Sequence, residues 1–454
     1  MMTHHFWRSL RLFLPGSIVL VLMACVQGQP PKAEIVLKSS SIKPSPGSTE
    51  RSKTIAKPAE PGVIPTIAPA RLNIKSLSTK TLSTKLPNTN FMIFGGGGAP
   101  SYNEIAIEKN VFYFQRTLKV LSPNVNWNDR TNIWFANGND GRKTVRYMDG
   151  DRERFKAPTV TPIMGSATRS NLNLALKTEA ESASPLFFYF TGHGSHNLQD
   201  ENNNAMILWD EQSMPVRQFT TQLDAMPTEK PFVAVMVQCY SGSFANLIYQ
   251  GGNPKRGIAM HDRCGFFATV KSLPSVGCTP EVNEADYQDY SSSFFAGLSG
   301  VNRVGEKVSS ADYDKDGRIS FREAHAFAKI DEQAQDLPVS TLEVWLQERL
   351  NEADRKSILS MPIAEIIKQG RPEQVMVVRS LSQSLGYDRQ KSDRANRSAL
   401  KLNSSLDSSL KQTYSERITM ELLNIMAEKK VKQSGKANWI AILEKLLNCE
   451  GRSL

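Results

Sequence analysis

Two apolar stretches each lead into a side chain that could do chemistry. The stretch LFFYFTGHGS, residues 186–195, places His193 between two glycines, and PFVAVMVQCYSGS, residues 231–243, places Cys239 at the corresponding point. A thiol becomes a strong nucleophile when a nearby imidazole takes its proton and stabilises the thiolate. One helical segment, residues 218–226, separates the two stretches, so we expect neighbouring parallel strands. Because sites form at the C-terminal ends of such strands, the sequence predicts a Cys239–His193 catalytic dyad.

Gly194 adds a second feature to this predicted site. It leaves its backbone N–H open to a substrate, and with the N–H of Cys239 it could hold the oxyanion of a tetrahedral intermediate. Simpler interpretations compete with this one. A cysteine at the end of a buried strand is often a small core residue. His193 and His196 could instead be two metal ligands, although no third ligand follows at a recognisable spacing.

The segments around the two strands predict an α/β fold. Apolar runs indicate further strands, and apolar residues at helical spacing indicate helices between them. This alternation predicts a mostly parallel sheet covered by helices on both faces, followed by a helical C-terminal region. The expected strands lie at residues 91–94, 132–137 and 265–270, and the expected helices at 103–121, 167–180, 340–370 and 414–449. The polar stretch 388–412 is expected to be loose.

The strand-ending motifs FFYFTGHGS and QCYSGS resemble those of the caspase–legumain clan of cysteine peptidases, and are most similar to its legumain-like branch. The resemblance covers about residues 91–330 and implies a caspase-like fold that hydrolyses peptide bonds. In that branch a Tyr-Asn pair supplies the asparagine that orients the histidine, which here corresponds to Asn103. Two positions depart from the branch: Ile105 replaces an arginine, and Tyr240 replaces an acid.

The resemblance also implies where a substrate side chain would bind. The clan lines its specificity pocket from the segment after the next strand, here residues 268–293, which contains Ser275 and Asp289. Asp289 resembles the pocket aspartate of legumains, and without the arginine it would suit a lysine or arginine before the scissile bond. Asp286 or Glu284 could equally be surface charges.

The segment DYDKDGRISFRE, residues 312–323, matches the EF-hand calcium loop. Alternating carboxylates surround a hard cation, a glycine permits the sharp turn, and a final glutamate supplies two oxygens. The predicted Ca²⁺ ligands are Asp312, Asp314, Asp316, the backbone carbonyl of Arg318, and Glu323. No second loop is found to pair with this one, so a structural ion is expected.

The N-terminus predicts export and a lipid anchor. Two arginines precede an apolar run that ends in LMAC, which resembles the bacterial lipoprotein cleavage box, so residues 1–24 are expected to be removed and Cys25 to be acylated. An ordinary signal peptide is the alternative. Acyl chains would hold the protein at the membrane without a spanning helix. In the Gram-negative lipoproteins that this segment resembles, a residue other than Asp after the cysteine, here Val26, implies the outer membrane of the cell envelope. Residues 25–90, rich in Pro, Ser and Lys, are a predicted disordered tether.

The charge distribution bears on nucleic-acid binding, and the remaining cysteines bear on a disulfide. Most of the formal charge of +10 lies in the first 90 residues, so the folded part has little excess charge with which to bind nucleic acid. Cys264 and Cys278 could form a disulfide, but sequence alone cannot fix the pairing, and Cys449 is expected to be a buried apolar residue.

The predicted organisation is a peptidase domain at 91–333, including the calcium loop, and a helical region at 334–454. The predicted function is a membrane-anchored cysteine endopeptidase that acts on protein or peptide substrates. The alternatives are a catalytically inactive calcium-binding interaction module and a transamidase of the same clan.

Overall fold

The structure is a computed structural model that describes residues 88–400 and 407–454. The predicted signal peptide, Cys25 and nearly all of the predicted tether lie outside these residues. Within them, no helix combines the length and the apolar character needed to cross a membrane.

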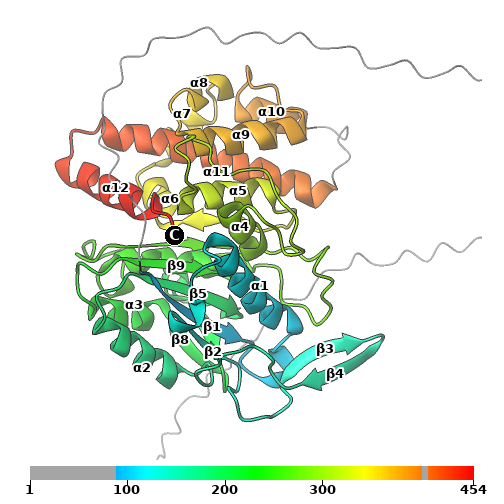
Figure 1. Ribbon diagram of the computed structural model, residues 1–454. Coiled ribbons are helices and arrows are strands. Elements are labelled where there is room, and N and C mark those ends of the chain that lie inside the picture. The colour runs from blue at the N-terminus through cyan, green and yellow to red at the C-terminus, as the bar shows by residue number, and fades with distance from the viewer. Residues whose placement is uncertain (1–87, 401–406) are drawn as a thin grey trace, which may run out of the picture. The chain divides into compact units, whose positions relative to one another are not determined.

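The centre of the molecule is a six-stranded sheet with the order β11-β10-β9-β5-β1-β2 (Figure 1). All neighbouring strands are parallel except β10 and β11, which are antiparallel. This confirms the α/β class with a mostly parallel sheet. The strands are β1 (Asn90–Gly96), β2 (Thr131–Phe135), β5 (Leu186–Gly192), β9 (Phe232–Met236), β10 (Arg263–Phe267) and β11 (Val339–Ser340).

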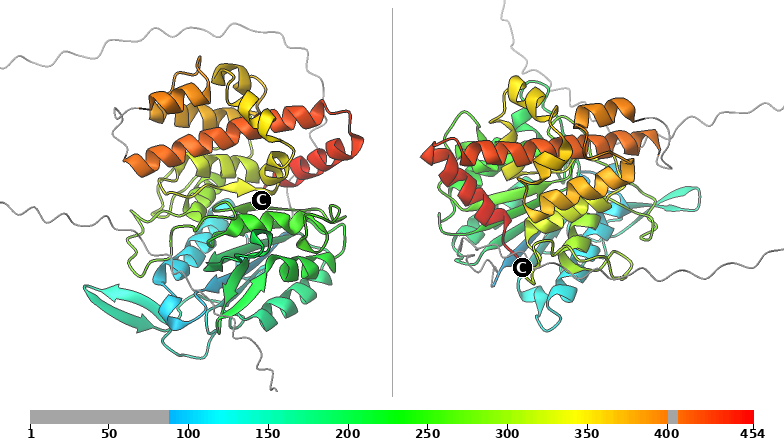
Figure 2. Two further views of the ribbon diagram at one scale, coloured as in Figure 1. Left: turned by 180° about the vertical axis from the view of Figure 1, so that it is seen from behind. Right: turned by 90° about the horizontal axis from the view of Figure 1, so that it is seen from above.

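Helices cover both faces of the sheet, and alternate residues of the central strands pack against them (Figures 1 and 2). Phe187 of β5 packs on Phe114 of one helical layer, and the next residue, Phe188, packs on Phe219 of the other. Because both faces are buried, β5 and β9 consist entirely of buried residues. The first layer holds α1 (Ile105–Leu121), α4 (Tyr290–Ser299) and α5 (Phe321–Asp331), and the second holds α2 (Arg169–Ala180) and α3 (Val216–Asp224).

The helical C-terminal region continues the fold of the sheet domain. The long helix α11 and helix α9 pack together, and α9 also packs on α5, so the described residues belong to one compact unit (Figure 2). The helices are α6 (Thr341–Gln347), α7 (Glu352–Ile358), α8 (Ile363–Ile367), α9 (Pro372–Leu385), α10 (Asp393–Ala399), α11 (Ser408–Lys432) and α12 (Ala437–Glu450). Helix α10 lies in the stretch that was expected to be loose.

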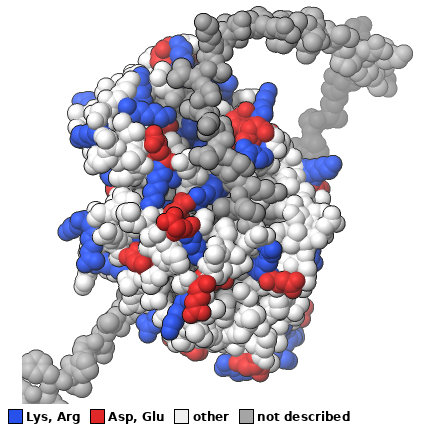
Figure 3. Space-filling view, turned by 60° about the vertical axis from the view of Figure 1, so that its left-hand side comes forward, with Lys and Arg blue, Asp and Glu red and all other residues white. Residues whose placement is uncertain are grey.

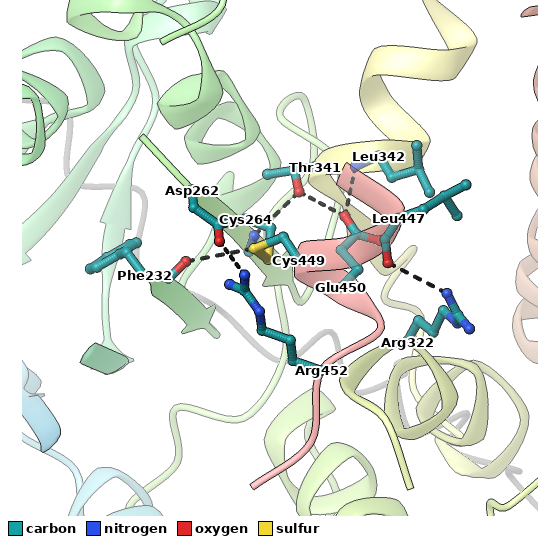
Figure 4. Close-up of a disulfide and its surroundings, with 11 residues drawn as sticks. Phe232, Asp262, Cys264, Arg322, Thr341, Leu342, Leu447, Cys449, Glu450 and Arg452 are labelled. Atoms are coloured by element: carbon teal, nitrogen blue, oxygen red, sulfur yellow. Dashed lines mark hydrogen bonds and ion pairs between the residues drawn. A yellow bond between two sulfur atoms is a disulfide. The ribbon is translucent and has the colours of Figure 1, made fainter. Parts of the chain in front are cut away.

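A disulfide joins Cys264 of β10 to Cys449 of α12 (Figure 4). The suggested Cys264–Cys278 pairing is therefore wrong, and Cys449 is a bonded half-cystine. The reason is the sheet topology, which brings the end of the C-terminal helix beside a central strand across a sequence separation of 185 residues. Cys278 is not in a disulfide.

Two small sheets lie outside the predicted elements. A hairpin of β3 (Val145–Asp149) and β4 (Arg152–Lys156) projects from the body (Figure 1). A three-stranded antiparallel sheet follows β5 in the chain and consists of β6 (Gly194–Ser195), β7 (Ala205–Leu208) and β8 (Gln212–Pro215). Basic and acidic side chains are interspersed among uncharged ones on the part of the surface that Figure 3 shows in colour.

Candidate active site and calcium loop

The register of the parallel strands β5 and β9 places His193 and Cys239 at the same level. Phe190 pairs with Met236, and each reactive residue lies three positions further along the chain, just beyond the end of its strand. The backbones that carry them are in contact, because a Cβ on Gly194 would lie 2.1 Å from the carbonyl oxygen of Cys239. Only glycine fits at this position. The predicted dyad residues are therefore brought to one edge of the sheet.

Two oxygen atoms hold the imidazole of His193. Its Nε2 lies 2.9 Å from the carbonyl oxygen of Tyr102 and 3.0 Å from Oε2 of Glu104. The second carboxylate oxygen of Glu104 accepts a hydrogen bond from the guanidinium of Arg146, at 2.7 Å. Glu104 is buried, which raises the pKa of its carboxyl, but the hydrogen bond to His193, the charge of that ring and the bond to Arg146 outweigh burial and lower the pKa overall.

These contacts assign the tautomer of His193. A carbonyl oxygen and an ionised carboxylate can only accept, so Nε2 must carry the proton. The other nitrogen, Nδ1, then keeps a lone pair in the neutral ring and can take the proton of a thiol. The His193–Glu104 pair therefore has the arrangement of a general base with an orienting acid.

Asn103, which was predicted to orient the histidine, has a different role. Its Oδ1 accepts a hydrogen bond from the N–H of Gly97, at 3.2 Å, and its Nδ2 donates to the carbonyl of Thr144, at 3.2 Å. Its fully buried amide ties two loops together. The orienting side chain is the next residue in the chain, Glu104. The sequence contained this acid, but nothing in it showed which of the two adjacent side chains turns toward His193.

The thiol of Cys239 lies under the loop that follows β10. The backbone N–H of Ser275 donates to Sγ at 3.3 Å, and Sγ lies 3.6 Å from the carbonyl oxygen of the same residue. Asp336 fixes this loop, accepting from the hydroxyl of Ser275 at 2.7 Å and from the N–H of Val276 at 3.1 Å. Ser275, predicted to line a substrate pocket, thus contacts the sulfur through its backbone. The N–H donor at the sulfur would stabilise a thiolate, whereas the carbonyl oxygen accepts from the S–H group and stabilises the protonated thiol.

Tyr240, the residue after Cys239, stacks on His196. The residue after Cys239 adopts a left-handed conformation, with φ of 61°, and its ring stacks on His196 with centroids 4.6 Å apart. His196 also lies 3.3 Å from Glu201. Tyr240, at the position that departs from the legumain pattern, therefore contacts His196.

Asp289 is buried and caps helix α4, so its carboxylate is not free to bind a basic substrate. Its two oxygens accept from Tyr287, Asn110, the hydroxyl of Ser291, and both the N–H and the hydroxyl of Ser292. Asp289 is therefore not the unpaired pocket aspartate that the sequence predicts. Glu284, one of the alternative acids, pairs with Lys109 and Arg116 at the surface.

The predicted calcium loop, residues 312–323, brings three of its four carboxylates together. Ligand oxygens of Asp312, Asp314 and Glu323 lie within 4.8 Å of one another. Asp316 turns instead to the guanidinium of Arg318, at 2.7 Å. Gly317 has a φ of 86° and makes the predicted turn, and Glu323 also caps the following helix α5.

The electrostatics of these carboxylates suit a cation. The pKa of Asp314 and that of Glu323 are both raised, chiefly by desolvation, with some repulsion between like charges. A bound cation would remove this repulsion. The donor set consists of hard oxygen ligands, which fits Ca²⁺.

Comparisons with known proteins assign no family to this chain. No family model matches it, and no curated protein matches it. Solved structures similar to it include protein GSU0716 from Geobacter sulfurreducens, with a TM-score of 0.32 and 10% sequence identity over 56% of this chain and 92% of that chain. At this TM-score the similarity carries no inference about fold or function.

Proposed function

We propose that this protein is a cysteine endopeptidase. The observation that carries the proposal is the placement of His193 and Cys239 at the same level of adjacent parallel strands, with the histidine oriented by Glu104. A buried acid–imidazole pair beside a thiol is the arrangement that nucleophilic catalysis requires. A purely structural cysteine and histidine would not need it.

The reaction follows from these positions. Nδ1 of His193 takes the thiol proton of Cys239, and the thiolate attacks the peptide carbonyl to form a tetrahedral intermediate. The N–H groups of Gly194 and Cys239 stabilise its oxyanion. The imidazolium then gives its proton to the departing amine, which leaves an acyl-enzyme. Water, deprotonated by His193, attacks this thioester, releases the acid and restores the thiol.

Access to the nucleophile involves the loop that carries Ser275. Cys239 is only 6% exposed, and the loop is held against its sulfur by the bonds to Asp336. We propose that this loop moves when a substrate binds. Because Asp289 is occupied by hydrogen-bond donors, we do not assign it the recognition of a basic residue.

The test uses the full chain with fluorogenic peptides that carry Arg, Lys, Asn or Asp before the scissile bond. Cleavage by the wild type that is lost in both Cys239→Ala and His193→Ala would support the peptidase. An added amine that appears in the product would indicate acyl transfer rather than hydrolysis. If neither the wild type nor the variants cleave any peptide, even after trial proteolytic activation, the peptidase proposal is overturned and a binding module is favoured.

We also propose that the loop from Asp312 to Glu323 binds Ca²⁺ as a structural ion. Binding to the folded state alone stabilises it by roughly 2.7 kcal/mol at a calcium concentration 100 times the dissociation constant. Thermal unfolding of the full chain should therefore shift upward with calcium, and Glu323→Gln should remove most of the shift. Asp286→Asn, an exposed acid outside the loop, is the control and should keep it. A calcium effect that Glu323→Gln leaves intact would place the ion elsewhere.

The membrane anchor is a proposal from the sequence, since Cys25 lies outside the described residues. We propose that Cys25 carries the acyl chains. Incorporation of labelled palmitate by the wild type and its absence in Cys25→Ala would support this, and equal labelling of both would contradict it.

A further inference from the structure

Cys278 lies beside the histidine and the acid of the candidate active site. One ligand atom each of Glu104, His193 and Cys278 lies within 4.8 Å of the other two. The first belongs to the segment before α1, the second follows β5, and the third belongs to the loop after β10. Within the described residues, this is the one mixed nitrogen, oxygen and sulfur group of that compactness.

The loop that carries Cys278 is fixed on both sides. Tyr287 donates from its hydroxyl to the carbonyl of Gly277 at 2.5 Å, and Gly277 packs so closely on Asp289 that a Cβ there would lie 2.9 Å from the Cβ of Asp289. On the other side, the carbonyl of Thr279 accepts from the N–H of Ala106 at 3.4 Å. Tyr287 also donates to the carboxylate of Asp289, at 3.3 Å, so Asp289 helps to hold the loop that carries Cys278.

The donor set matches one class of metal. Imidazole, carboxylate and thiolate are the zinc ligands, at about 2.0–2.3 Å from the ion, so ligand atoms in a tetrahedral site lie roughly 3.3–3.8 Å apart. The His193–Glu104 contact is already 3.0 Å. Cys278 is half-buried and its ligand atom lies within 4.8 Å of the other two, so a shift of roughly 1 Å would bring it to a tetrahedral separation. One carboxylate and one thiolate neutralise a divalent ion, and Arg146 occupies only Oε1 of Glu104.

We propose that Glu104, His193 and Cys278 bind a zinc ion, with water as the fourth ligand, and that this ion inhibits the enzyme. Coordination through Nε2 moves the ring proton of His193 to Nδ1, so the ring can no longer accept the proton of Cys239. The thiol of Cys278 loses its proton to solvent as the zinc–sulfur bond forms. The site is distinct from the calcium loop, whose donors are all oxygens. The inhibition rests on the proposed peptidase function, whereas the binding does not.

The binding test uses the full chain with Cys239→Ala, in oxygen-free buffer with calcium in excess to fill the oxygen-ligand loop. Cobalt(II) is the probe, because a thiolate ligand gives a near-ultraviolet charge-transfer band. We expect one equivalent of cobalt to produce the band and zinc to displace it. Adding Cys278→Ala should abolish the band and weaken zinc binding by roughly 100-fold or more, beyond the 10–100-fold typical for loss of a second-shell partner. His196→Ala, which removes the neighbouring histidine, is the control and should leave both unchanged.

The inhibition test compares the wild type with Cys278→Ala, each relative to its own rate without zinc. Zinc should inhibit the wild type reversibly, and Cys278→Ala should need at least tenfold more zinc for the same inhibition. Equal zinc affinity of the chains with and without Cys278, or equal zinc sensitivity of the two enzymes, would overturn the proposal. If the chain cleaves no peptide, the cobalt band still decides whether the metal site exists, so the two failures are distinguishable.

Discussion

At the scale of single residues, the candidate site depends on a short chain of side chains that ends at the thiol. Arg146 holds Glu104, Glu104 holds Nε2 of His193, and the strand register sets His193 beside Cys239. Each contact fixes the orientation of the next group. The orienting role of Glu104 can therefore be tested without altering Cys239, the proposed nucleophile, or His193, the proposed base.

Glu104→Gln should reduce kcat by on the order of 100-fold, because a neutral amide stabilises the imidazolium less than a carboxylate does. The Michaelis constant should change little, since Glu104 acts on the base and is buried away from solvent. Steady-state kinetics on the best peptide substrate measure both constants. Arg146→Gln, one step further from the ring, should reduce kcat less. Full activity of Glu104→Gln would assign the orientation of His193 to the carbonyl of Tyr102 alone.

Gly194→Ala should both destabilise the protein and abolish activity. The added Cβ would meet the carbonyl oxygen of Cys239 at 2.1 Å, so the two strand ends must separate, and overpacking of this kind costs typically 1–3 kcal/mol. Gly257→Ala is a matched control, because a Cβ there meets nothing within 4 Å. Urea unfolding and peptide cleavage measure the two effects. A stable, active Gly194→Ala would show that the strand ends are not in contact.

The residues of the site differ in how far sequence could predict them. His193 and Cys239 stand out because each follows a buried strand, and the parallel fold makes their meeting nearly inevitable. Glu104 and Asn103 are adjacent and both polar, so only the folded loop decides which of them faces the ring. Cys278 reaches the site through a long loop, whose path depends on contacts with distant residues.

At the scale of elements, prediction succeeded for the longer apolar strands of the central sheet and failed for short or exposed strands, such as β7, which is buried but only four residues long. The central strands β5 and β9 are mostly apolar and wholly buried. The hairpin strand β4 reads RERFK and is largely exposed, so it has no apolar periodicity to reveal it. Arg146 comes from this hairpin, so no sequence pattern predicts that it contacts Glu104.

The Cys264–Cys449 disulfide joins two elements and closes a loop across 185 residues. Cys264→Ser should lower the free energy of unfolding by roughly 2–5 kcal/mol, the usual effect of removing a native disulfide. Cys278→Ser should have little effect on stability, because Cys278 is not in the disulfide. Urea unfolding compares the variants, and peptide mapping without reduction identifies the linked cysteines. A Cys264–Cys278 peptide would contradict the structure.

At the scale of the whole molecule, buried charges join the sheet domain to the C-terminal helices. Lys329 of α5 contacts Glu421 of α11 at 2.7 Å and also pairs with Glu343 of α6. Nearby, Glu450 of α12 accepts from the hydroxyl of Thr341 and from the N–H of Leu342, each at 2.7 Å (Figure 4). Because these carboxylates are buried, a change in their protonation changes the stability of the packing between the C-terminal helices and the rest of the chain. This packing should therefore depend on pH.

The carboxyl of Glu450 should make a clear contribution to the pH dependence of stability. Burial raises the pKa of its carboxyl from 4.5 to about 7, against the hydrogen bonds that lower it. The folded chain therefore binds more protons than the unfolded chain between these values, so the contribution of this group is full below pH 4.5 and is lost as the pH rises through about 7. The loss corresponds to about 3 kcal/mol for a single carboxyl.

Glu450→Gln should remove this part of the pH dependence, since an uncharged amide keeps an acceptor oxygen for Thr341 and Leu342. The difference in unfolding free energy between the variant and the wild type should shift in favour of the variant by about 3 kcal/mol between pH 4.5 and pH 8. Urea unfolding at a series of pH values measures it, and taking the difference cancels the other titrating groups. Glu352→Gln, at an exposed position on α7, should give a difference that does not change with pH. If the Glu450→Gln difference is equally flat, the carboxyl is ionised in the folded state, and the C-terminal helix must leave it open to water.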